Sequence, residues 1–315
     1  MVLVLASLAV RPDAVVASPP PLPAGEVEAT PLTRELDVLL GNEPGLYGVV
    51  IMTPDGNTLY SRNRDVPFVA ASLFKVVVMV SVFEQEAAGT LRRDEALPGW
   101  GTIADALFAM IVHSDNGSSV VLIDRVGGID VVNETANRLG LNHTRLDVGA
   151  GWVEDLPQEA SRDSTRESIQ QGKAFVADSA AGATVDVTTP DDMARFFRLL
   201  LGGQVVNADA SKAMLELLAQ QEIRDRLPVL LPPNTVLAHK TGNLPSVIHD
   251  AGIIATPAGP LIVAALAEAM PAEGRAFEVI QQLALVVYET AERPLRWEEP
   301  PRGATSRAVH SWQER

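Results

Sequence analysis

The segments of this sequence that favour β-strands lie near its two ends, on either side of a long helical stretch. Residues 47–52 are continuously apolar, and a Pro-Asp-Gly turn signal separates them from residues 57–60. A second pair of apolar segments, 251–255 and 261–266, encloses a Pro-Ala-Gly-Pro turn. Short turns join antiparallel neighbours. We therefore predict an α+β fold: both ends form one antiparallel sheet flanked by helices, the middle forms an all-helical lobe, and the active site lies in the cleft between them.

This pattern divides the chain into lobes. Residues 32–70 and 219–292 form the predicted α/β lobe, with helices expected at 32–40 and 271–289, and residues 71–218 form the helical lobe. Residues 1–31 begin with an apolar run and continue as a proline-rich tether, whereas residues 293–315 mix proline, charge and glycine and are expected to be a loose tail. The first segment resembles a secretory signal that lacks its basic start, so we expect a periplasmic or secreted protein.

Composition narrows the classes of function. A formal charge of −15 argues against nucleic acid as a partner, because phosphates would be repelled. The absence of cysteine excludes disulfides, thiolate metal sites and a cysteine nucleophile. The five histidines show no spacing typical of metal ligands. We therefore expect no metal or organic cofactor and no stable protein partner, and a small molecule as substrate.

Ser72 and Lys75 open a long apolar segment and are the first candidate pair for chemistry. On a helix, residues three apart share a face, so the hydroxyl and the amine would be neighbours. A lysine in an apolar wall has a lowered pKa and can take the proton of the serine. Of the 25 basic residues only four are lysines, which leaves 25 − 4 = 21 arginines and makes each lysine notable. The alternative interpretation is a capping serine beside a lysine that reaches to solvent.

Two further triplets carry polar side chains at places where elements are expected to end. Ser114-Asp115-Asn116 lies between two predicted helices, and Lys240-Thr241-Gly242 lies on a strand candidate. The first triplet can place a hydroxyl and an amide beside a site, or it can simply cap a helix. The second can offer a cation and backbone N–H groups to an anionic substrate, or it can be an ordinary strand end.

Together and in this order, the three motifs resemble the class A β-lactamases and their penicillin-binding relatives. The resemblance covers residues 32–292 and includes segments 141–147 and 186–190, which are similar to the flanks of the family's omega loop. It implies a β-lactamase/transpeptidase-like fold and an acyl-enzyme formed with β-lactam or peptidoglycan-like substrates. The implied catalytic residues are Ser72 as nucleophile, Lys75 as its base and Ser114 as proton shuttle. The implied substrate-binding residues are Asn116, Lys240, Thr241, Gly242 and Asn243, with the backbone N–H groups of Ser72 and Asn243 forming the oxyanion hole.

The omega loop is where the sequence departs from the family. The family carries there a glutamate that activates water for deacylation, and Ala150 stands at the equivalent position. The loop, residues 148–185, is also enlarged, and Glu154 is the nearest substitute for the missing base. Val148 replaces the arginine that pairs with the loop aspartate, for which Arg162 or Arg166 are candidate substitutes, and His249 replaces an asparagine.

These departures keep three readings open. The first is a class A-like β-lactamase, of the kind that confers antibiotic resistance, with slow deacylation. The second is a D-alanyl carboxypeptidase or esterase that uses the same serine. The third is a module that binds or senses β-lactams without turnover. Acylation requires a nucleophile, a base and an oxyanion hole, whereas deacylation requires a positioned water and its own base.

Overall fold

The computed structural model describes residues 30–147, 186–270 and 272–291. The signal-like segment, the enlarged loop with Ala150 and Glu154, and the C-terminal tail lie outside the described residues. The first described element is α1 (Pro31–Gly41), which begins with a capping bond from the Thr33 backbone N–H to the Thr30 hydroxyl. Its residues Leu36 and Leu40, one turn apart, are fully buried.

A five-stranded antiparallel sheet joins the two ends of the chain, as the sequence predicts. Its spatial order is β2-β1-β9-β8-β7. The central contact pairs β1 with β9, two strands separated by more than 200 positions in the sequence. The strands are β1 (Leu46–Met52), β2 (Thr58–Arg62), β7 (Leu237–Leu244), β8 (Val247–Thr256) and β9 (Gly259–Glu268).

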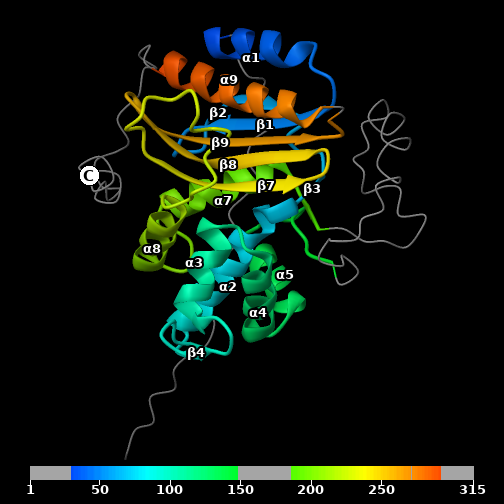
Figure 1. Cartoon of the computed structure of the whole chain (residues 1–315). Helices are drawn as coiled ribbons and strands as arrows, with labels where there is room; N and C mark the ends of the chain where they lie inside the picture. The colour runs from blue at the N-terminus through cyan, green and yellow to red at the C-terminus, as the bar shows by residue number, and fades with distance from the viewer. Residues whose placement is uncertain (1–29, 148–185, 271, 292–315) are drawn as a thin grey trace, which may run out of the picture.

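Helices cover both faces of this sheet (Figure 1). On one face lie α1 and α9 (Glu273–Ala291), which contact each other along their lengths. Strand β1 supplies both cores: Val49 and Ile51 belong to the cluster under α1 and α9, whereas Val50 and Met52 belong to the cluster on the opposite face. This alternation explains why β1 is continuously apolar, since each face of the strand is buried against helices.

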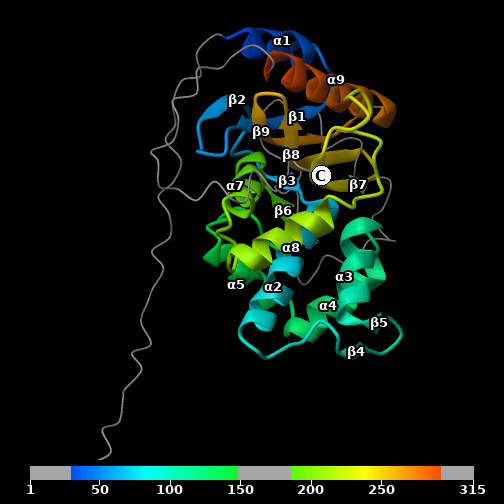
Figure 2. The same cartoon turned by 90° about the vertical axis from the view of Figure 1, so that its left-hand side faces the viewer.

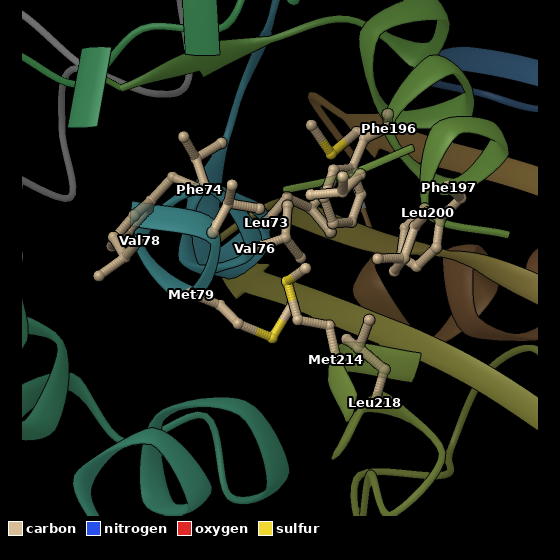
Figure 3. Close-up of a cluster of buried hydrophobic side chains, with 14 of the residues drawn as sticks. Leu73, Phe74, Val76, Val78, Met79, Phe196, Phe197, Leu200, Met214 and Leu218 are labelled. Carbon is tan, nitrogen blue, oxygen red and sulfur yellow. The ribbon is translucent and has the colours of Figure 1, made fainter. Parts of the chain in front are cut away.

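The opposite face packs on α7 (Pro190–Leu201), α8 (Ala208–Leu218), the short 3₁₀ turn η1 (Ala71–Phe74) and α2 (Lys75–Ala87). Figure 3 shows side chains of η1 and α2 gathered with aromatic and aliphatic side chains of α7 and α8. Helix α7 belongs to the segment that we assigned to the helical lobe, yet it packs directly on β1 and β9. The reason is its strongly one-sided apolar face, which includes Phe196, Phe197 and Leu200.

The remaining helices surround α2, which lies at their centre in both views (Figure 1 and Figure 2). They are α3 (Ile103–Val112), α4 (Asn116–Val126) and α5 (Ile129–Arg138), with a small hairpin of β4 (Ala96–Leu97) and β5 (Gly101–Thr102) before α3. Strand β3 (Phe68–Val69) pairs with β6 (Val187–Thr188), so the segment after the omega loop lies beside the segment before η1. Among the described residues, no helix combines the length and apolar character needed to cross a bilayer.

Candidate active site

Ser72 lies in the η1 turn, between strand β3 and helix α2. The sequence predicts a helix from Ser72 onward, whereas the α-helix begins only at Lys75. The cause is Ala71, whose φ of 44° places the residue before the serine in the left-handed region. A 3₁₀ turn repeats every three residues, so Ser72 and Lys75 still lie on one side of the chain. Strain at a residue next to a nucleophile is typical of functional sites.

Lys75 is fully buried and points its ammonium at the loop between α3 and α4. Its Nζ donates to the Ser114 carbonyl oxygen at 2.6 Å and to Asn116 Oδ1 at 2.7 Å, and lies 3.4 Å from the Ser114 hydroxyl. Burial lowers the pKa of Lys75 to about 8, although the negative charge of Asp115 opposes the shift. A fraction of the amine is therefore neutral near neutral pH and can accept a proton.

The loop that faces Lys75 both caps helix α4 and binds the two lysines. Asp115 caps α4 by accepting the Ser118 backbone N–H at 2.6 Å, so the capping interpretation holds for this residue. Ser114 has a φ of 58°, and this left-handed conformation accompanies the turn of its carbonyl and hydroxyl toward the lysines. Asn116 begins α4 with its side-chain oxygen on Lys75.

Lys240 approaches the same hydroxyl from strand β7. Its side chain is fully buried, and its Nζ donates to Ser114 Oγ at 2.8 Å and to the Thr241 carbonyl oxygen at 2.9 Å. Burial lowers the pKa of Lys240 well below its usual value, and the nearby charge of Lys75 lowers it further. Two amines therefore meet at one serine oxygen. A hydroxyl has two lone pairs and one proton, so when both amines donate to it, the Ser114 proton is free to point elsewhere.

The edge strand β7 passes close to the η1 turn at Gly242. A Cβ placed on Gly242 would lie 3.2 Å from Ala71 Cβ and 3.3 Å from His249 Cβ, so only glycine fits without displacing a neighbour. Thr241 precedes it and is buried, and Asn243 follows with an exposed side chain. The close approach brings strand β7 beside Ala71, the residue before Ser72, and the oxyanion hole of the Ser72 and Asn243 backbone N–H groups stays a prediction.

Arg226 is a residue of this site that the sequence gives no reason to select. Its side chain is almost fully buried, stacks on the Phe277 ring at 4.7 Å and donates a hydrogen bond to Asn243 Oδ1. Its positive charge also lowers the pKa of Lys240. The arginine lies in an irregular segment before β7, so neither helical nor strand spacing marks it.

Asp147 and Asp186, which flank the segment 148–185, meet beside η1. The Asp147 backbone N–H donates to Asp186 Oδ1 at 2.8 Å, and the Ala70 backbone N–H donates to the Asp186 carbonyl oxygen at 2.8 Å. Arg145 pairs with Asp147 at 2.7 Å. Burial and the charge of Asp147 raise the pKa of Asp186 to about 6. The loop itself, including Val148, Glu154 and the two candidate arginines, lies outside the described residues.

No metal centre is evident in the part of the chain that the structure describes, where no three histidine, aspartate or glutamate side chains gather as ligands would. The side chains that meet are instead two buried lysines, Lys75 and Lys240, with the hydroxyl of Ser114 and the amide of Asn116. The model of the β-lactamase enzyme family matches residues 31–291. The chain belongs to this family. By family and fold it is a serine β-lactamase-like hydrolase.

Several solved structures share the fold. A β-lactamase from Sphaerobacter thermophilus is 25% identical, with a TM-score of 0.65 over 83% of this chain and 96% of the other. A structure of PBP-A is 23% identical, with a TM-score of 0.67 over 87% and 100% of the two chains. An ancestral class A β-lactamase is 23% identical, with a TM-score of 0.67 over 82% and 99%. These likenesses confirm the predicted α+β architecture.

Proposed function

We propose that this β-lactamase-family protein is acylated on Ser72 by β-lactam amides and releases the acid slowly. The observation that supports acylation most strongly is the meeting of two buried amines, Lys75 and Lys240, at the Ser114 hydroxyl. Burial is what makes Lys75 chemically useful, because it lowers the pKa of the amine and favours the neutral form that can accept a proton. A variant of the similar protein PBP-A has been solved as an acyl-enzyme complex with penicillin G.

In the proposed acylation step, neutral Lys75 takes the proton of Ser72 while the serine oxygen attacks the lactam carbonyl carbon. The backbone N–H groups of Ser72 and Asn243 stabilise the negative charge that develops on the carbonyl oxygen. Ser114 then gives its proton to the leaving nitrogen, and Lys75 passes the proton that it took from Ser72 to the Ser114 oxygen. Lys240 and Thr241 hold the carboxylate of the substrate, and Asn116 keeps Lys75 in place.

We propose slow deacylation because the family's water-activating glutamate has no equivalent in the sequence, where Ala150 stands. A deacylating base must lie within hydrogen-bond reach of the attacking water. Glu154 is the nearest candidate. Replacing Glu154 with Gln is expected to slow product release without changing the rate of adduct formation. Unchanged turnover would exclude Glu154 as the base.

The test follows the intact mass of the purified protein after mixing with benzylpenicillin, together with loss of the β-lactam ring. We expect a mass increase of one benzylpenicillin that forms quickly and decays slowly, and that is absent in Ser72→Ala. A matched control is Ser61→Ala, which makes the same change on the remote edge strand β2. Adduct formation that persists in Ser72→Ala would refute the assignment of the nucleophile.

The same experiment distinguishes the three hypotheses about function. Ring loss far beyond one equivalent identifies an efficient β-lactamase and contradicts slow release. A permanent adduct without any product identifies a binding or sensing module. Absence of both adduct and ring loss rules out β-lactam recognition. Hydrolysis of D-alanyl-D-alanine peptides or of simple esters then tests the carboxypeptidase and esterase readings.

A further inference from the structure

Two backbone segments must be held at a fixed separation for the proposed oxyanion hole to work. One is the turn that carries Ser72, and the other is strand β7 at Gly242 and Asn243. The donors of such a hole act only when they are placed accurately before the reaction. His249, on strand β8, pairs with Gly242 of the second segment and binds the strand that leads into the first, and its side chain is fully buried.

His249 binds the strand that leads into the nucleophile turn. Its Nε2 lies 2.8 Å from the Val69 carbonyl oxygen, three residues before Ser72. The same Val69 is held on its other side, because its backbone N–H donates to Glu268 Oε2 at 3.0 Å. Both backbone groups of this residue are thus bound by side chains of the sheet. The Phe68 ring packs edge-on against the His249 ring, with centroids 6.1 Å apart.

The two bonds of the imidazole fix its tautomer. The Ala267 backbone N–H lies 3.2 Å from His249 Nδ1, and a backbone N–H can only donate, so Nδ1 is the acceptor. The carbonyl oxygen of Val69 can only accept, so Nε2 carries the proton. Burial lowers the pKa of His249 to about 4, so the ring is neutral at neutral pH. A neutral ring with one donor and one acceptor satisfies both neighbours at once.

The same residue also packs against β7, where it pairs with Gly242. Cβ and Cδ2 of His249 lie 3.3 Å from the position that a Cβ on Gly242 would occupy. Ala71, the left-handed residue before the nucleophile, lies 3.2 Å from that position. His249 therefore lies against strand β7 at Gly242, close to Ala71, and it also binds Val69 in the strand that leads into the turn.

We propose that His249 is a positioning residue that holds the turn of Ser72 against strand β7 through its bond to the Val69 carbonyl oxygen. The proposal rests on the acylation chemistry proposed above. In this role His249 affects the rate at which Ser72 is acylated, and its side chain does not contact the substrate.

Three variants separate the two bonds of the ring. His249→Phe keeps an aromatic ring and removes both bonds. In His249→Gln the amide nitrogen reaches the position of Nε2, so the donor to Val69 is kept. In His249→Asn the shorter amide matches Nδ1 and keeps only the acceptor for Ala267. Val279→Ala is the stability control, because it removes buried atoms of the core on the other face of the sheet.

The measurement is the second-order rate constant for acylation by benzylpenicillin, from intact mass, alongside the thermal midpoint of each variant. We expect His249→Phe and His249→Asn to be acylated about 10- to 100-fold more slowly, as small misplacement of reacting groups costs about that much. His249→Gln is expected to recover most of the rate. Val279→Ala is expected to lose thermal stability and keep its rate.

An unchanged rate in His249→Phe, or recovery by Asn and not by Gln, would overturn the proposal. If His249→Phe does not fold, nitrogen NMR of the wild-type ring decides instead: a protonated Nδ1 or a charged ring refutes the bond to Val69. Failure of the wild-type protein to form any adduct is a different result. It refutes the proposed acylation itself, independently of His249.

Discussion

Lys75 is expected to make the fold less stable at neutral pH than at alkaline pH, and the effect can be calculated from its burial. The pKa of its amine falls from 10.5 to about 8 in the folded protein, because the buried ammonium loses hydration that Asp115 does not replace. One pKa unit corresponds to about 1.4 kcal/mol, so the shift amounts to roughly 3 kcal/mol of unfolding free energy.

The sign of this pH dependence follows from which state, folded or unfolded, holds the Lys75 proton at each pH. Below pH 8 both the folded and the unfolded protein carry the Lys75 proton, and the full penalty of the buried charge is present. Between pH 8 and 10.5 the unfolded chain retains a proton that the folded protein has lost, so stability rises with pH. Above this window the penalty is absent. The buried amine is therefore costly under the conditions in which the site works.

The assay compares wild type with Lys75→Met by urea unfolding, followed by circular dichroism, across this pH window. Methionine keeps the length of the side chain and removes the titration. We expect the stability of wild type to rise relative to the variant by roughly 3 kcal/mol. The acylation rate of wild type should rise with an apparent pKa near 8, and the variant should form almost no adduct. Parallel stability curves for the two proteins would refute the reasoning.

Three further changes test other parts of the structure. Ser114→Ala removes the oxygen shared by the two lysines, and should lower the acylation rate about 100-fold or more while the circular dichroism spectrum stays unchanged; a wild-type rate would exclude the proton shuttle. Asp186→Asn should stabilise the fold above pH 6 by up to about 3 kcal/mol and not below pH 3.8, because only the folded carboxyl has a raised pKa. Urea unfolding at both extremes of pH measures this. Gly252→Ala places a methyl group against the Ala238 carbonyl oxygen of the neighbouring strand, and should lower the unfolding free energy by about 2 kcal/mol or more. The control Gly41→Ala has open space around the new methyl group and should not lower the unfolding free energy.

Local sequence patterns predict most of the elements and their order. Helices α1 and α9 and strand β1 each begin and end within two residues of their expected bounds. These predictions succeed because helix and strand periodicity, turns and caps depend on residues close together in the chain. The start of α2 is an exception. Ala71 is left-handed and residues 71–74 form a 3₁₀ turn, so the α-helix begins only at Lys75, and no sequence pattern marks this turn.

The capping interpretation of the Ser114-Asp115-Asn116 triplet shows how one short segment can do two things. Asp115 caps α4, as its residue type favours, while its neighbours bind the lysines. Sequence alone left these as alternatives. The structure assigns them to different residues of the same triplet, because the turn at Ser114 directs successive side chains to opposite sides.

The sequence by itself determined the α+β class, the joining of both ends in one sheet, and the residues of the three motifs. Tertiary structure alone decided that Lys75 and Lys240 meet at Ser114, that Arg226 binds Asn243, and that His249 binds Val69. Lys240 and Ser114 are 126 positions apart, and His249 and Val69 are 180 apart. Periodicity reports on neighbours within a few turns, whereas contacts at such separations depend on how the sheet and helices pack. The pKa values that give these lysines their chemistry arise from that packing, because burial is a property of the folded chain.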